Sequence, residues 1–199
     1  TGGLAFRFGD ESLNAKSASA SNKPAHQQRN FNPQASGPVI PGRISVNFSG
    51  QSSEQESAGD NIIAITPDGS LSRGVVSPSR SIVLSPRFII GLNERQRVNF
   101  NVNYQDSKST NLGSGFTLPE SGSKSNRRQL GMQLSINSTF GKWNNEIRSQ
   151  MNRNRTVSTP LSDVGAYAGT YSISVADSFS GGPSQDRSRD STRSFQLAD

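Results

Sequence analysis

Few side chains in this 199-residue chain could carry out covalent chemistry. His26 is the one histidine and cysteine is absent, so a histidine triad, a thiol nucleophile and a multi-histidine metal site are all excluded. The adjacent carboxylates Asp10 and Glu11 would point to opposite faces of a strand, which argues against a shared catalytic role. We therefore expect a protein that is not an enzyme and that holds no metal and no cofactor.

Cationic side chains are the remaining candidates for ligand binding. Arginine supplies 16 of the 21 basic residues, and its planar guanidinium favours geometrically specific contacts. The net charge of +6 is spread evenly over the chain, and the basic segment 187–193 has no interleaved aromatic residues. We therefore expect no nucleic-acid partner. The candidate ligand contacts, all in polar spacers, are Arg73, Arg127, Arg128 and Arg155.

The segments that must position these arginines alternate apolar and polar residues. In 97–104 every even residue is apolar or aromatic and every odd residue is polar, which is the period of a strand with two unlike faces. Segments 43–49, 82–90 and 129–140 repeat the pattern. Within 82–90, Pro86 predicts a bulge or a strand end, because it lacks a ladder N–H. Weaker versions of the pattern occupy 4–8, 31–35 and 195–197.

A hairpin is predicted where the two-residue spacer Gly141-Lys142 separates 129–140 from a further strand, 143–151. Glycine in the first position suits a type II′ turn. This turn places Phe140 opposite Trp143 and brings the apolar faces of the two strands together. The further pairs that follow are Ile136 with Ile147, Leu134 with Ser149, and Met132 with Met151.

Short and long connections alternate along the chain. A compact soluble domain rarely contains several long loops, whereas an outer-membrane barrel has short periplasmic turns and long extracellular loops. The short connections are 37–42, 91–95 and Gly141-Lys142. The long polar connections are 10–26, 51–80, 106–127 and 152–193. Ligand contact is expected on loops 52–80, 107–127 and 153–192 of the long-loop side.

A membrane barrel also explains why only 30% of the residues are hydrophobic, against about 45–50% in soluble globular chains. Only the outward face of a barrel meets lipid, so the inward face is polar. The sequence therefore predicts an all-β fold, an antiparallel up-and-down transmembrane β-barrel segment of seven to eight strands over residues 1–199. A soluble antiparallel sandwich and a disordered chain are the alternatives.

Strand parity assigns the side chains of this wall to faces. The expected lipid-facing residues are Val98, Phe100, Val102, Leu130, Met132, Leu134 and Ile136. The expected lumen-facing residues are Asn99, Asn101, Asn103, Gln129 and Gln133. Aromatic residues expected at the membrane interfaces are Tyr104, Phe140 and Trp143.

Several motifs resemble a known family. The stretches 6–15, Lys23-Pro24, Gln27-Gln28-Arg29 and 36–40 (Ser-Gly-Pro-Val-Ile) resemble early barrel strands of TonB-dependent outer-membrane receptors. The likeness is to the Oar-like group, which often has a carboxypeptidase-regulatory-like N-terminal domain. Residues 175–182 are similar to a loop motif of the same group.

The resemblance implies a part of a receptor in the outer membrane of Gram-negative cells, with outer-membrane lipid and a small solute as partners. Such receptors take up a scarce solute, namely an iron chelate, cobalamin or a glycan, through a barrel of about 22 strands around a plug. The TonB energy-coupling complex would act through parts that are not evident here. Because the chain begins and stops within expected strands, a fragment is favoured over a small self-contained barrel, such as an adhesin or structural protein. A secreted soluble β-domain that binds polysaccharide is the third alternative.

Overall fold

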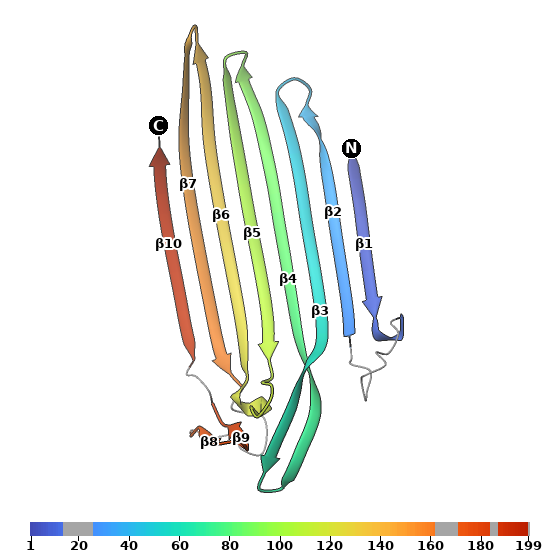
Figure 1. The fold of residues 1–199 in the computed structure, drawn as a ribbon. Helices are drawn as coiled ribbons and strands as arrows, with labels where there is room; N and C mark the ends of the chain where they lie inside the picture. The colour runs from blue at the N-terminus through green and yellow to red at the C-terminus, as the bar shows by residue number, and fades with distance from the viewer. Residues whose placement is uncertain (14–25, 162–170, 184–186, 199) are drawn as a thin grey trace.

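The computed structural model describes residues 1–13, 26–161, 171–183 and 187–198. Eight strands form one antiparallel sheet in the order β1-β2-β3-β4-β5-β6-β7-β10, and β8 and β9 form a separate hairpin (Figure 1). The expected all-β, antiparallel fold is therefore confirmed. The sheet strands are β1 (Gly2–Asp10), β2 (His26–Ile40), β3 (Ile44–Thr66), β4 (Gly69–Asn93), β5 (Gln96–Asn111), β6 (Ser123–Phe140), β7 (Trp143–Pro160) and β10 (Ser188–Ala198). The remaining elements are β8 (Ile173–Val175), β9 (Phe179–Gly181) and the 3-10 turns η1 (Glu11–Leu13) and η2 (Pro119–Ser121).

The two ends of the sheet differ in their connections, as the sequence predicts. Turns of two or three residues join β2 to β3, β4 to β5 and β6 to β7 at one end. The extended β3–β4 ribbon, η2 and the β8–β9 hairpin all lie at the other end (Figure 1). Among the described residues, no helix is long and apolar enough to cross a membrane.

The β6–β7 hairpin has the predicted register. Phe140 pairs with Trp143, and the ladder continues without a shift to Ser123 and Pro160. Gly141 has φ +62°, and the φ of Lys142 is not positive. This is the sign pattern of a type II′ turn, in which only the first central residue has positive φ. The turn prediction is confirmed.

The expectation of a bulge or strand end at Pro86 is wrong. Pro86 pairs with Phe48 in an uninterrupted register between β3 and β4. On the other side, the pairs between β4 and β5 stop at Leu84 and resume at Arg87 in the same register. The missing N–H of proline interrupts one ladder locally, and the flanking pairs on both sides keep the strand in place.

The expected long loops are shorter than the sequence suggests, because polar residues continue the strands. Segment 51–80 is mostly ladder, since β3 and β4 run on to a tight turn at Pro67-Asp68. Between β5 and β6 only 112–122 lies outside strands, and β7 continues to Pro160. These strand ends are rich in Ser, Asn and Thr, so they lack the apolar alternation that marks a strand in a sequence. Pairing with a neighbouring strand determines their conformation instead.

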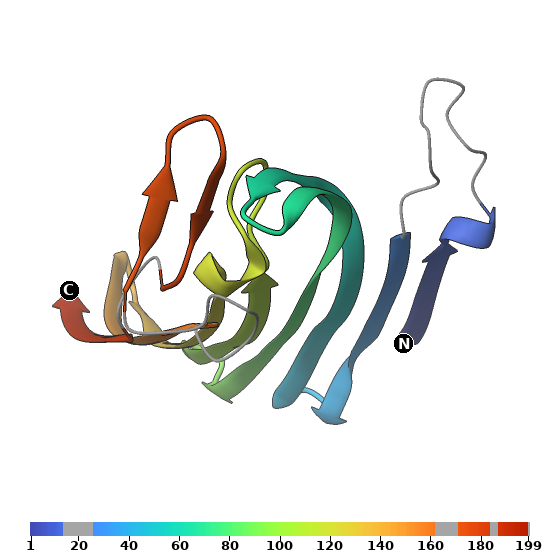
Figure 2. The ribbon, with the colours of Figure 1, turned by 90° about the horizontal axis from the view of Figure 1, so that it is seen from below.

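Viewed along the strands, the sheet is an open arc whose unpaired edges are β1 and β10 (Figure 2). The β8–β9 hairpin, η2 and the tip of the β3–β4 ribbon lie over the concave side (Figure 2). The convex side carries none of these segments. The arc therefore has two faces with different surroundings, and strand parity decides which side chains each face receives.

The tight turn offers a test of the hairpin. Gly141→Val should destabilise the folded state by about 1–2 kcal/mol, because a β-branched residue is strained at positive φ. Gly141→Asn is the matched control, since asparagine tolerates this conformation. Urea unfolding of the full-length protein refolded in detergent micelles measures both. Equal midpoints for the two variants would contradict the assigned turn.

Candidate functional site

The convex face carries rows of apolar side chains that cross the sheet. One row joins Phe48, Val102, Met132 and Met151 through the register of β3 to β7. In the next row, the rings of Phe88 and Phe100 stack with their centroids 6.3 Å apart. Directly paired residues share one face, so these rows form a continuous apolar surface. The expected lipid-facing residues all belong to this face: Val98, Phe100, Val102, Leu130, Met132, Leu134 and Ile136.

No segment of the described residues packs on this apolar face. Among the described residues, 22 large hydrophobic side chains are exposed and six hydrophobic residues are buried. Phe6, Phe195 and Leu197 remain 65–69% exposed. Apolar patches of more than a few hundred Å² mark a surface that meets a partner or a membrane. The convex face is therefore the surface on which contact with a partner or a membrane is most expected.

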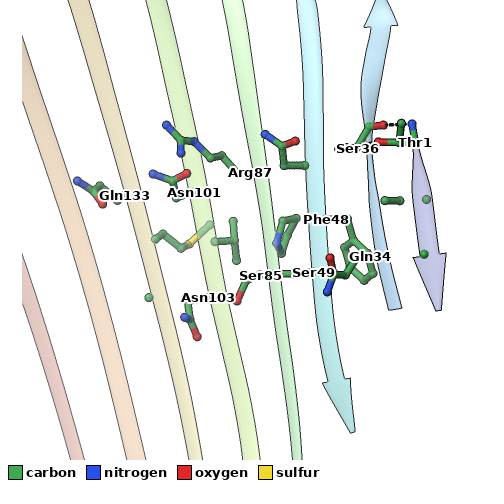
Figure 3. Close-up of a pocket in the computed structure, with 18 of the residues that line it drawn as sticks. Thr1, Gln34, Ser36, Phe48, Ser49, Ser85, Arg87, Asn101, Asn103 and Gln133 are labelled. Carbon is green, nitrogen blue, oxygen red and sulfur yellow. Dashed lines mark hydrogen bonds between the residues drawn. The ribbon is translucent and has the colours of Figure 1, made fainter. Parts of the chain in front are cut away.

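The concave face is polar and rich in amides. It contains all five expected lumen-facing residues, Asn99, Asn101, Asn103, Gln129 and Gln133. Asn101 and Gln133 belong to a row that continues through Arg87 and Gln150. The row borders a trough of about 950 Å³ that extends from β1 to β7 (Figure 3).

Many polar groups of the trough are available to a ligand. Asn99 donates to Ser135 Oγ at 3.4 Å, but within the described ranges no hydrogen bond joins Asn101, Asn103 or Gln133 to another side chain. An amide offers two donors and one acceptor oxygen, so such a wall can bind hydroxyl groups, peptide groups or water. A second cavity of about 900 Å³ lies nearer the short turns. Its lining includes four arginines, Arg43, Arg87, Arg95 and Arg97.

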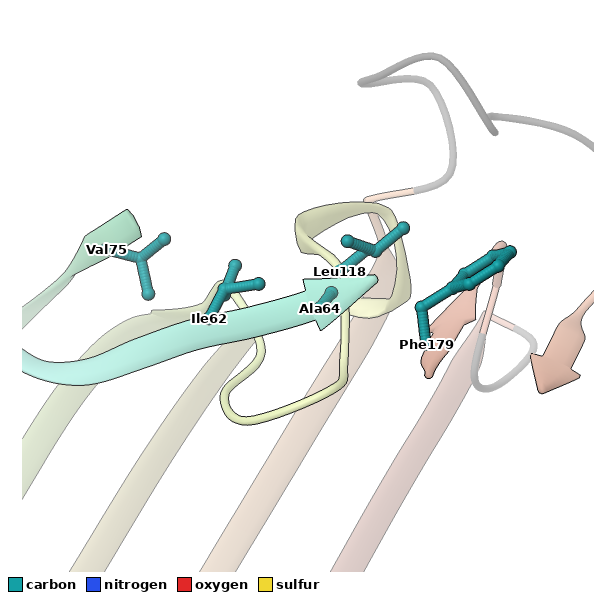
Figure 4. Close-up of a cluster of buried hydrophobic side chains, with 5 residues drawn as sticks. All are labelled: Ile62, Ala64, Val75, Leu118 and Phe179. Carbon is teal, nitrogen blue, oxygen red and sulfur yellow. The ribbon is translucent and has the colours of Figure 1, made fainter. Parts of the chain in front are cut away.

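A small hydrophobic core lies at the long-connection end, away from the middle of the sheet. The register between β3 and β4 shifts between Ser57 and Asp60, so β3 has one extra residue there. Such a bulge reverses which face successive residues occupy. Ile62 and Ala64 consequently lie on the same side as Val75 of β4, which belongs to the concave side. We call the resulting cluster the cap core: Ile62, Ala64, Val75, Leu118 and Phe179 (Figure 4).

Backbone hydrogen bonds connect the three segments of the cap. Ile63 N–H donates to Gly115 O at 2.7 Å, and Leu118 N–H donates to Ser180 O at 2.8 Å. Gly122 allows a close approach, because an added Cβ would lie 2.2 Å from Asn111 O. Sequence reasoning missed this cluster. Its one signal was the apolar run 62–65, which gives no indication of its contacts with 112–122 and 173–181.

The four candidate arginines are not brought together. Arg127 and Arg128 are adjacent on β6 and face opposite sides, and Arg128 Nε lies 3.2 Å from Asp106 Oδ2 on the convex face. Arg155 pairs with Arg128 across β6 and β7, so it is also on the convex face. Arg73 lies on the β3–β4 ribbon, beside Ile62. Arg127 faces the concave side, and Arg73, two residues from Val75 on β4, is on the same side farther out on the ribbon.

The three expected interface aromatics lie on the convex face at its two limits. Phe140 and Trp143 flank the short turn and are 54% and 80% exposed. Tyr104 pairs with Leu130 and is followed on the same face by Asp106. The aromatic residues therefore border the apolar rows, with Asp106 and its neighbours beyond them on the long-connection side.

The limit between apolar and charged residues on the convex face runs obliquely across the strands. Going from the short turns toward the long connections, the apolar residues of β1 continue to Phe8, which precedes Asp10, and those of β7 continue to Met151, which precedes Arg153. The hydrogen-bonded register carries Phe8 across to Lys108 of β5 but carries Met151 to Val102. Between β1 and β7 the limit thus moves six residues over six strand-to-strand steps, an average of one residue per step, and between β7 and β10 it does not move, because Phe195 pairs with Met151. On β3 the limit is less sharp, because the small residues Gly50 and Ser52 lie between Phe48 and Glu54 on this face.

Comparisons with protein families, curated proteins and solved structures found no match. Within the described part of the chain, no group of three or more His, Cys, Asp or Glu residues could hold a metal ion.

The cap core can be tested by truncating a buried side chain. Leu118→Ala should destabilise the cap by about 2 kcal/mol or more, since it removes buried methyl groups at a 2% exposed site. Backbone amides of Ile63 and Leu118 should then exchange hydrogen at least about 30-fold faster, while ladder amides of β5 and β6 do not change. Phe116→Ala, at a 49% exposed site in the same loop, is the control. A uniform increase over the whole sheet would contradict a separate cap.

Proposed function

We propose that this chain is part of the wall of a transmembrane β-barrel in the outer membrane, and that the barrel is a TonB-dependent receptor for a scarce solute. The observation that carries the proposal is the oblique limit of the apolar face. In a barrel the strands are tilted, but the lipid layer is level, so the apolar band must cross the hydrogen-bonded rows at an angle.

The size of the drift supports this geometry. One residue along a strand is about 3.3 Å, and adjacent strands are about 4.8 Å apart. A drift of one residue per step therefore corresponds to a tilt of roughly 35°, and strands of outer-membrane barrels are tilted by about 35–45°.

The contents of the two faces agree with the same interpretation. An uncovered apolar face is costly in water, at about 25 cal/mol for each Å² exposed, and lipid would remove that cost. The concave face carries the amides, the trough and the cap core, so it fits a water-filled or plugged interior. A secreted polysaccharide-binding domain would use the trough but would leave the apolar face exposed.

An open arc favours a large barrel over a small closed one. Eight strands can close into a barrel, yet here β1 and β10 do not pair with each other. Unpaired strand edges are not tolerated in lipid, so further strands would have to complete the wall. This agrees with the resemblance to receptors of about 22 strands. The bound solute, of the iron-chelate, cobalamin or glycan class, and the coupling to the TonB complex rest on that resemblance.

Lipid contact distinguishes the two faces directly. In the full-length protein reconstituted in vesicles, a fluorophore at position 102 or 132 should be quenched by a lipid-soluble spin label. A fluorophore at the neighbouring positions 101 or 133 should be spared, because adjacent strand residues face opposite sides. Phe100→Arg should cost about 2–4 kcal/mol if this residue lies at mid-membrane, and Asn101→Arg should cost less. Equal quenching at all four positions would refute a lipid-facing convex side.

Solute uptake tests the receptor part of the proposal. Arg127 and Arg128 are neighbours with equal charge, and Arg127 alone faces the interior. Arg127→Ala should weaken binding of an anionic or hydroxyl-rich solute by about tenfold, by loss of a charge-assisted hydrogen bond. Arg128→Ala should leave solute affinity unchanged. The measurement is the affinity of the solute for cells that carry each variant at matched receptor levels. A larger loss of affinity for Arg128→Ala than for Arg127→Ala would overturn the assigned sides.

A further inference from the structure

The convex face differs between the two ends of its apolar rows. At the short-turn end the rows give way to uncharged residues such as Gln96, Ser138 and Asn145, beside Phe140 and Trp143. At the long-connection end they give way to a belt of charge. By strand register, the belt cations on this face are Arg29, Arg80, Lys108, Lys124, Arg128, Arg153, Arg155, Arg189 and Arg193. The belt carboxylates on the same face are Asp10, Glu54, Glu56 and Asp106.

The belt has a surplus of positive charge. Its nine cations exceed its four carboxylates by five, and two of these carboxylates form ion pairs. Arg80 Nε lies 3.4 Å from Glu54 Oε1, and Arg128 Nε lies 3.2 Å from Asp106 Oδ2. Both arginines are more than half exposed, and ion pairs at a solvated surface contribute little to stability, so folding alone does not explain this concentration of arginine and lysine.

The belt contains a cavity of about 520 Å³ between β5, β6 and β7. Four cations line it: Lys108, Lys124, Arg128 and Arg155. Val157 adds an apolar side chain to the lining. Arg155 Nε is buried and has no hydrogen-bond partner in the described part of the chain, and the same holds for Asp106 Oδ1. A buried guanidinium N–H without an acceptor is costly, so an anionic acceptor at this cavity would lower the free energy.

We propose that this cavity binds the phosphorylated headgroup of a membrane lipid whose acyl chains lie along the apolar rows beside it. The inference rests on the proposed membrane location of the convex face. Two features of the site select a lipid over free phosphate: the cations lie directly beyond an apolar surface, and they are on the face opposite the trough and cap. Arginine and lysine supply the fixed donors that a phosphate requires. The long-connection end would then lie in the leaflet that has more negative charge.

The test uses full-length protein in neutral detergent, titrated with a diacyl phosphatidic acid and monitored by native mass spectrometry. Each cation at an anionic lipid surface contributes a factor of about five in affinity. Lys124→Gln combined with Arg155→Gln should therefore weaken phosphatidic acid binding about 25-fold. Arg127→Gln, next to Arg128 but on the other face, is the matched control and should leave binding unchanged. Lys124→Arg keeps the charge and should also keep the affinity, which separates loss of charge from misfolding.

Two further comparisons test whether the bound phosphate belongs to a lipid or is free in solution, and whether the convex face lies in a membrane. A zwitterionic lipid with the same acyl chains should bind at least tenfold more weakly, and inorganic phosphate should not displace phosphatidic acid. Displacement by inorganic phosphate would overturn the lipid assignment, as would equal binding of the two lipids. If fluorophores at positions 102 and 132 are quenched by the lipid-soluble spin label while the double variant retains full affinity for phosphatidic acid, this inference fails and the proposed barrel stands. If those positions are not quenched, both fail.

Discussion

The hydrogen-bonded ladder that crosses eight strands is the constraint on which the rest of the structure depends. Between β5 and β6 the register has no shift from Gln96 to Asn111. Between β6 and β7 it has no shift from the pair Phe140–Trp143 to the pair Ser123–Pro160. A strand has a side-chain period of two, so a fixed register gives every residue of a row the same face. The apolar rows and the amide rows are continuous because the register shifts lie outside them, near the short turns and at Ser57 to Asp60. Pro86 shows how strong the constraint is, since the pairs of Ser85 and Pro86 with β5 are missing, yet the register is the same on either side of the gap.

The one place where β3 slips against β4 has the largest local effect. The extra residue between Ser57 and Asp60 moves Ile62 and Ala64 to the side of the sheet where Leu118 and Phe179 can reach them. The only hydrophobic core cluster in the described residues therefore forms where three connections meet, and not on the sheet itself. The trough is lined by residues nearer the middle of the sheet, none of which belongs to the cap core. In a receptor, such a cap would stand between the external medium and the interior of the wall.

In the proposed barrel, the two ends of the convex face would give the wall a direction in the membrane. Aromatic residues border the apolar rows near the short turns, and an excess of arginine and lysine borders them near the cap. Long basic side chains can lay their methylene stems on apolar surface while their charged ends reach an anionic layer. The same wall would then orient the barrel, contact lipid and present its polar face to a solute, with each task assigned by parity alone.

The sequence by itself determined the strands with large alternating side chains, the faces of residues 97–104 and 129–136, and the β6–β7 turn. These features are local: a period of two and one glycine at the required position suffice to specify them. The sequence did not indicate that Gln51 to Arg80 is mainly strand, because serine and asparagine pair there without an apolar signal. Nor did it separate Arg127 from Arg128 as ligand contacts, because both were expected at the edge of a loop, and only the pairing of β5 with β6 shows that the strand and its parity continue through them. The bulge at Ser57, the cap core and the cavity at Arg155 were decided only by the tertiary structure, because each brings together segments that are far apart in the chain.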